Sequence, residues 1–120
     1  MELKSILKEI VEKVGGGIGA VIMGYDGIPI EEYELEGIFE VQVVAVEYVN
    51  VMKELKRTLE VLKTGEMEEI LITTEQSRII IRSICDDFFI MLALDCNGNY
   101  GKGRYLLKRE APNLRDELLL

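Results

Sequence analysis

The sequence predicts an α/β protein of the α+β type, a three-layer α/β/α sandwich around a five-stranded antiparallel sheet. Three observations predict this fold. Apolar residues repeat at helical spacing near both ends and in the middle of the chain, and short apolar runs bounded by turn residues lie between them. Two of those runs are apolar on both alternating faces, so helices must cover both sides of the sheet. The expected order is α-β-β-α-β-β-β-α, in a single domain over residues 1–120.

The first helix is predicted by an apolar repeat with Glu and Lys on the outside, and the glycines Gly15-Gly16-Gly17 end it. The repeat consists of Leu3, Ile6, Leu7, Ile10, Val11 and Val14. A hairpin should follow, because apolar runs over 18–24 and 28–33 flank a turn that contains Asp26-Gly27. Pro29 cannot donate a hydrogen bond to a neighbouring strand, so the second strand is expected at a sheet edge.

The segment from Ile38 to Lys63 predicts one long helix that ends at Thr64-Gly65. Its many valines would also suit a strand, but the pattern is far longer than an ordinary strand. At about 100° per residue, one broad face is apolar and should contact the core. This face contains Val41, Val44, Ala45, Tyr48, Val49, Met52, Leu55, Leu59 and Leu62.

A second set of apolar residues lies on the opposite side of this helix. Phe39, Val43, Val46 and Val61 fall among Glu47, Asn50, Lys53, Glu54 and Arg57. An apolar patch on an outer helix face indicates an association surface, which predicts that another subunit or protein covers it. Two alternatives stay open: a loop of the same chain could cover Phe39, Val43 and Val46, and the charged residues could form an ordinary solvated face.

Three strands joined as a meander should follow, and a third helix should close the chain. The strands are expected at Met67–Thr74, Arg78–Cys85 and Phe88–Asp95, with turns at Glu75-Gln76-Ser77 and Asp86-Asp87. The third helix is expected from Asn99 to Leu120, with Pro112 kinking or dividing it.

The charge and the absence of targeting segments argue against nucleic acid and membranes as partners and favour the cytoplasm. A formal charge of −8 and a pI near 4.6 oppose binding to nucleic acid or to anionic membranes. No signal peptide or transmembrane run is recognisable, so a cytoplasmic protein is expected. Cys85 and Cys96 lie at opposite ends of a predicted hairpin, too far apart for a disulfide, and free thiols suit that compartment.

The chemistry-bearing residues favour a protein that is not an enzyme and carries no cofactor or metal. The chain has no histidine, which excludes Ser-His-Asp and Cys-His catalysis and most zinc and haem sites. Asp86-Asp87 could be paired carboxylates but suit a turn better. The two cysteines could be redox-active, although no CxxC spacing is present. Gly98, Gly101 and Gly103 around Lys102 could bind an anion, but the phosphate-loop spacing is missing, and close helix packing is the simpler interpretation.

Three segments, taken together with the element order, resemble the Roadblock/LC7 family across essentially the whole chain. They are IGAVIMGYDGIPI at residues 18–30, MEEILITTEQSRIIIRSICDDFFIMLAL at 67–94 and NYGKGRYLLKR at 99–109. The first resembles the family's first hairpin, the second its three-strand meander, and the third the opening of its final helix. The resemblance implies the profilin-like Roadblock/LC7 fold.

The resemblance also implies an adaptor function. Family members form homodimers or heterodimers in which the central helices lie side by side and one edge strand from each subunit joins the sheets into ten strands. They serve as dynein light chains, as scaffolds for small Ras-like GTPases and, in the MglB group, as partners that stimulate nucleotide hydrolysis. Carried over by position, the pairing strand is Met67–Thr74, with Ile70, Ile72 and Thr74 at the interface, and the pairing helix is Ile38–Lys63.

The function expected from the sequence is therefore a non-enzymatic, dimeric adaptor that binds and regulates a small Ras-like GTPase. The partner copy is expected to be a second molecule of this chain or a paralogue. Two alternatives remain: a structural light-chain-type scaffold without nucleotide dependence, and a PAS-like or profilin-like sensor that encloses a small molecule.

Overall fold

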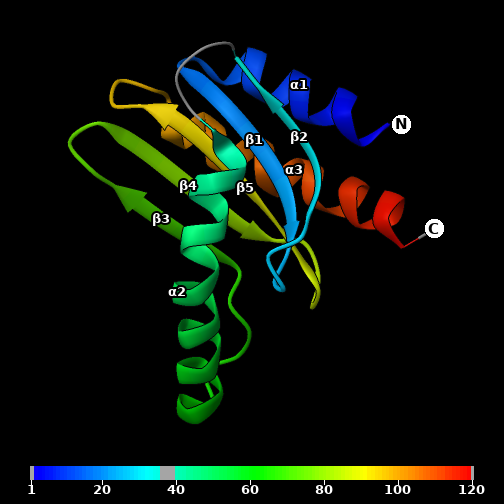
Figure 1. The fold of residues 1–120 in the computed structure, drawn as a ribbon, viewed down its shortest axis with the longest axis vertical. Helices are drawn as coiled ribbons and strands as arrows, with labels where there is room; N and C mark the ends of the chain where they lie inside the picture. Colours follow the sequence, from blue (N-terminus) through cyan, green and yellow to red (C-terminus); the bar gives the residue numbers. More distant parts are fainter. Residues whose placement is uncertain (1, 36–39, 120) are drawn as a thin grey trace.

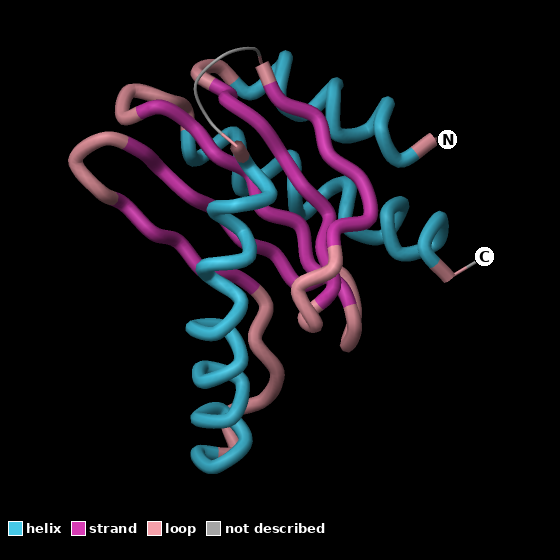
Figure 2. Tube along the Cα trace, viewed as in Figure 1, coloured by secondary structure: helices cyan, strands magenta, loops and turns pink. Residues whose placement is uncertain are grey.

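The protein is a three-layer α/β/α sandwich, as the sequence predicts. The structure, a computed structural model, describes residues 2–35 and 40–119. The sheet is antiparallel throughout, in the order β2-β1-β5-β4-β3. Helices α1 and α3 cover one face and α2 lies on the other (Figures 1 and 2). The elements are α1 Leu3–Val14, β1 Gly17–Gly24, β2 Pro29–Glu34, α2 Val41–Leu62, β3 Glu69–Thr73, β4 Ser77–Ser83, β5 Phe88–Asp95 and α3 Tyr100–Leu118.

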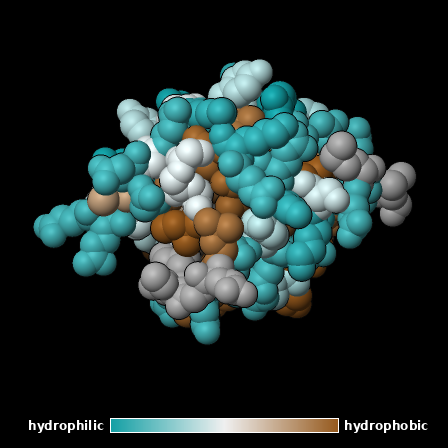
Figure 3. All heavy atoms as spheres, turned by 90° about the horizontal axis from the view of Figure 1, so that it is seen from above, coloured by the Kyte–Doolittle hydropathy of each residue, from teal (hydrophilic) through white to brown (hydrophobic). Residues whose placement is uncertain are grey.

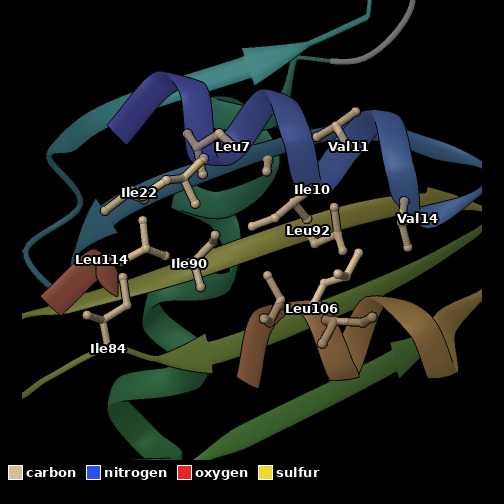
Figure 4. Packing of buried hydrophobic residues seen from close by; sticks show 14 of the residues in the cluster. Leu7, Ile10, Val11, Val14, Ile22, Ile84, Ile90, Leu92, Leu106 and Leu114 are labelled. Carbon is tan, nitrogen blue, oxygen red and sulfur yellow. The ribbon is translucent and has the colours of Figure 1, made fainter. Parts of the chain in front are cut away.

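One buried cluster fills the space between the sheet and the pair α1 and α3. The apolar stripe of α1, with Leu7 and Ile10 at its centre, packs on Ile22 and Ile90 of the sheet, and Leu106 of α3 closes the cluster (Figure 4). All five side chains are at most 3% exposed. Burial of a side chain of this size contributes about 1.5–3 kcal/mol, so this layer holds both terminal helices on the sheet.

A second buried cluster lies on the opposite face of the sheet, under α2. Val41, Ala45, Val49 and Met52 of α2 are buried there, against a set of sheet residues. That set includes Val21, Met23, Ile79, Ile81, Phe89, Met91 and Ala93. Alternate residues of β1, β4 and β5 therefore belong to the two clusters in turn. This confirms the prediction that β4 and β5 are apolar on both faces, and β1 shares the pattern.

The two edges of the sheet are β2 and β3. Pro29 pairs opposite Met23 where the β1–β2 register shifts, and the expected edge position of this strand is confirmed. Strand β3 pairs along one side only, with β4, in a register that sets Ile72 opposite Ile79. Among residues 2–35 and 40–119, no strand pairs with its other side.

Helix α2 is shorter than expected, and its core stripe is narrower. The helix begins at Val41 after Glu40, and the expected helical residues Ile38 and Phe39 lie outside the described residues. It ends at Leu62, because Lys63 takes a left-handed conformation with φ 56°. Leu62, expected on the core face, is 60% exposed. The reason is that the last turns of α2 extend beyond the edge of the sheet (Figure 1).

Helix α3 runs unbroken from Tyr100 to Leu118, so Pro112 does not divide it. Asn99 caps the start of the helix, because its side-chain oxygen accepts a hydrogen bond from the Lys102 backbone N–H at 3.1 Å. Gly103 faces the sheet so closely that a Cβ atom there would lie 2.8 Å from Ile80 Cδ1. Close packing of the helix on the sheet, the simpler of the two interpretations, accounts for Gly103.

Candidate interaction surface on the central helix and the edge strand

The second apolar set predicted for the central helix faces solvent. Val43, Val46 and Val61 are 55%, 45% and 68% exposed. Phe39, expected beside them, lies outside the described residues. We call the described members of this face the outer stripe: Val43, Val46, Glu47, Asn50, Lys53, Glu54, Arg57 and Val61, all of them exposed.

The charged part of the outer stripe is organised by one ion pair. Arg57 Nε donates to Glu54 Oε2 at 2.9 Å, and this hydrogen bond raises the pKa of Arg57. Both side chains are well solvated, so the pair adds little to stability. It does hold the guanidinium along the helix surface, one turn from Val61. The outer stripe thus has apolar valines next to charged side chains, as in the mixed surface of a non-obligate interface.

A second apolar row on α2 lies between the core and the outer stripe. We call it the α2 flank: Val44, Tyr48, Val51 and Leu55, spaced at i, i+4, i+7 and i+11. Val44, Tyr48 and Leu55 pack against the buried cluster but are only partly buried, and Val51 is 57% exposed. Val44, Tyr48 and Leu55 were expected on the core face, whereas Val51 was not expected on either face.

Strand β3 continues this apolar surface onto the sheet. Ile70 and Ile72 point to the α2 side, next to Ile79 and Ile81, and pack against the same buried cluster while staying partly accessible. Helix α2 packs mainly over β1 and β2, on the side of the sheet opposite to the β3 edge. Strand β3 therefore extends beyond the area that α2 covers (Figure 1). The α2 flank and β3 therefore border one cluster from two directions.

Thr74, the last residue expected in the pairing strand, belongs to the β3–β4 turn instead. Its hydroxyl oxygen accepts hydrogen bonds from the backbone N–H groups of Gln76 and Ser77, at 3.3 and 3.1 Å. The strand ends at Thr73 for this reason.

The far end of α2 also contacts the β1–β2 and β4–β5 turns. Lys56 Nζ lies 3.6 Å from the centroid of the Tyr25 ring and 3.4 Å from the Asp86 carbonyl oxygen. The Tyr25 hydroxyl donates to Ser83 Oγ at 3.0 Å, and burial raises the pKa of Tyr25. Beside this contact is an open hollow of about 470 Å³, with Leu59 and Met67 in its lining. Its charged lining is mixed in sign, so it offers no clear preference for a charged ligand.

The groups of this chain that could bind a metal or react include its two cysteines. Cys85 and Cys96 are free thiols. Within residues 2–35 and 40–119, no group of three Cys, Asp or Glu side chains is placed to hold a metal ion. None of the helices in the same ranges combines the length and apolar character that a bilayer span requires. In a view from above, hydrophilic side chains cover most of the surface, and hydrophobic ones reach it near the centre (Figure 3).

Known structures share this fold. The chain is 34% identical to MglC from Myxococcus xanthus, over 98% of this chain and 99% of that one, with a TM-score of 0.70. A Roadblock/LC7 domain from Streptomyces avermitilis superposes over the full length of both chains with a TM-score of 0.87 at 11% identity. An MglB structure with a tetrameric arrangement matches 93% of this chain and 84% of its own, with a TM-score of 0.83 at 16% identity.

No protein-family model matches the sequence, and no curated protein does. The two likenesses of low identity establish the fold. The likeness to MglC adds sequence identity along almost the whole of both chains, and the element order and sheet are those implied by the sequence resemblance. The chain belongs to the Roadblock/LC7 family.

Proposed function

We propose that this chain is a non-enzymatic adaptor that forms a homodimer and, as a dimer, binds and regulates a small Ras-like GTPase. The observation that carries the proposal is the apolar surface shared by the α2 flank and β3, next to an unpaired strand edge. The likeness to MglC and to a tetrameric MglB supports association as the way in which such a surface is used.

In the proposed dimer, β3 pairs antiparallel with β3 of a second copy, so that two sheets become one of ten strands. The free N–H and C=O groups of β3 then find partners, and an exposed edge is removed. The two-fold rotation that relates the two copies also brings the two α2 helices side by side. Val51 and the accessible parts of Tyr48 and Leu55 are then buried between them. Each subunit contributes the same residues, as a two-fold interface requires.

The outer stripe is then left on the surface of the paired helices, where we place the GTPase. Val43 and Val46 supply an apolar centre, and Glu47, Lys53 and Arg57 supply a charged rim. Regulation would come from different affinities for the GDP and GTP conformations of the switch segments, since a partner shifts an equilibrium only through such a difference. No residue of this chain needs to enter the nucleotide site.

The experiment separates the two halves of the proposal. Ras-like GTPases of the source organism are purified, loaded with GDP or a non-hydrolysable GTP analogue, and titrated with the dimer. We expect tighter binding of one nucleotide form, a changed hydrolysis rate, and loss of both with Val46→Glu while the dimer mass is kept. Ser5→Glu, which adds the same charge at an exposed position of α1, serves as the control.

Two results would point elsewhere. Equal affinity for both nucleotide forms would make the chain a light-chain-type scaffold, and binding that survives Val46→Glu would remove the outer stripe from the interface. A heterodimer with a paralogue would appear as a mixed complex that displaces the homodimer.

A further inference from the structure

A second hollow lies on the opposite side of β3, away from α2. Helix α3 packs over β4 and β5 and stops short of the edge strand, so no helix of the described residues lies above the α3 side of β3. A hollow of about 350 Å³ remains there, floored by Ile80 and bordered by Leu71, Thr73, Arg78 and Tyr100. We call it the α3-side hollow. Leu71 and Tyr100 are 44% and 50% exposed, although both are large and partly apolar.

The α3-side hollow contains Arg78 and lies next to a basic run of α3, in a chain of net charge −8. Residues 100–109 contain Lys102, Arg104, Lys108 and Arg109 and no acidic residue. Tyr100, Arg104 and Lys108 follow one another at i, i+4 and i+8 and form a row along α3. The contact of Arg104 Nε with Glu69 Oε1 of β3, at 2.7 Å, fixes this row on the side of the edge strand.

Among the described residues, two basic groups have no carboxylate partner: Arg78 in the lining of the hollow, and Lys108, eight residues along α3 from Tyr100. Arg78 stands opposite Thr73 on the strand face that carries Ile80, and it is only partly exposed. Within residues 2–35 and 40–119, no carboxylate lies at ion-pair distance from Arg78 or Lys108. Arg104, by contrast, is already held by Glu69. In the described part of the chain, one free cation, Arg78, thus accompanies the apolar floor and the Tyr100 ring, and a second, Lys108, lies further along α3.

We propose that the α3-side hollow docks a short acidic segment of a partner protein. An apolar side chain of that segment sits on Leu71, Ile80 and the Tyr100 ring, and its carboxylates meet Arg78 and Lys108. Tyr and Arg are enriched where protein interfaces concentrate their binding energy. A guanidinium also binds a carboxylate through two parallel hydrogen bonds. Arg78 would therefore fix the orientation of the bound segment as well as attract its charge.

Charge and shape favour a peptide over other polyanions. A long duplex or an anionic membrane would meet the acidic remainder of the chain, whereas a segment of a few residues reaches these basic groups alone. A phosphate backbone also leaves the apolar floor unfilled. Docking in the α3-side hollow does not depend on the proposed dimer. In that dimer β3 pairs through its backbone edge, whereas Leu71 points out of the sheet plane.

The test uses the full chain and a display library of random 12-residue peptides. We expect enriched peptides to be acidic with one or two large apolar residues, and a synthetic copy to shift the amide NMR signals of Leu71, Thr73 and Tyr100. The double variant Arg78→Glu and Lys108→Glu should weaken this peptide at least tenfold. The matched control Lys4→Glu and Lys8→Glu on α1 changes the same charge and should leave its affinity unchanged.

Other outcomes overturn the proposal. These are enrichment of neutral or basic peptides, no enrichment at all, shifts on another face, or equal loss in the control variant. Tighter binding of a short DNA duplex or of phosphatidylserine vesicles, lost in the double variant, would replace the peptide by a polyanion. If the double variant without peptide has a lower mass in solution than the wild type, the α3-side hollow is instead occupied by a second copy of this chain. The outer stripe is untouched by these changes, so GTPase binding and this docking fail independently.

Discussion

Replacing Val51 by aspartate tests the proposed dimer at one side chain. Val51 is 57% exposed in the single chain, although it belongs to the same helical row as the partly buried Tyr48 and Leu55. In the proposed dimer it is buried against the α2 flank of the second copy. Aspartate at this position would lose the apolar contact and bring two carboxylates toward the two-fold axis.

The magnitude follows from the exposed fraction. Full burial of a valine side chain is worth about 1.5–2 kcal/mol, so the part still exposed in one chain accounts for about 1 kcal/mol. Symmetry doubles this to about 2 kcal/mol, which weakens the dimer about 30-fold, since each 1.4 kcal/mol is tenfold in affinity. Desolvation of the two carboxylates adds to the loss, so about 30-fold is a lower bound.

Sedimentation equilibrium over a range of concentrations measures the effect. The wild-type chain should approach twice its mass of 13.6 kDa, and Val51→Asp should shift the midpoint to at least about 30-fold higher concentration. Val43→Asp is the matched control, because Val43 is 55% exposed but lies on the outer stripe. Equal dimer affinities of the wild type and Val51→Asp, or an equal loss in Val43→Asp, would refute the assignment of the α2 flank.

Three further predictions concern the scaffold. Gly103→Val should lower the free energy of unfolding by about 1–3 kcal/mol in urea titrations, because its side chain would overlap Ile80, whereas Gly101→Ala, where an added Cβ meets nothing closer than 3.8 Å, should cost nothing. Asn99→Ala should cost about 1 kcal/mol in the same assay, because the cap of α3 is lost. Burial raises the pKa of Tyr25 above its ordinary value near 10, so the stability this group contributes is complete below pH 10 and is lost as the pH rises further. Tyr25→Phe should therefore make the fall in unfolding free energy above pH 10 less steep. An unchanged slope would contradict the link between the raised pKa of Tyr25 and this loss of stability.

The fold was predictable because its strands and helices carry unambiguous periodicity. Ile79, Ile80 and Ile81 are apolar in succession, and the structure divides them between the two buried clusters. A strand of that kind needs helices on both faces whatever the order of the other strands. The edge position of β2 was also readable, since Pro29 withholds a donor.

The α2 flank was not predictable from angles around the helix. Val44 and Leu55 fall within the broad apolar face, and only the lateral placement of α2 over β1 and β2 leaves them half covered. Helical angles describe one element, whereas burial depends on how far that element lies from the sheet edge. The same reason exposes Leu62, which extends past the sheet. One signal could have identified the α2 flank. The apolar face of this helix is broader than the sheet beneath it can cover, so a row of apolar residues along its side must stay accessible.

The difference between the two sheet edges explains why association should use β3 and not β2. Strand β2 begins with Pro29 and carries Glu31, Glu32 and Glu34, and α1 packs along it. Proline and repeated charge are the devices that keep an edge from pairing with another chain. Strand β3, Glu69–Thr73, has the sequence EILIT, with its one charged residue held by Arg82 and Arg104 at the start. A second copy that approached both edges would therefore find one blocked by like charges and the other open along its apolar length.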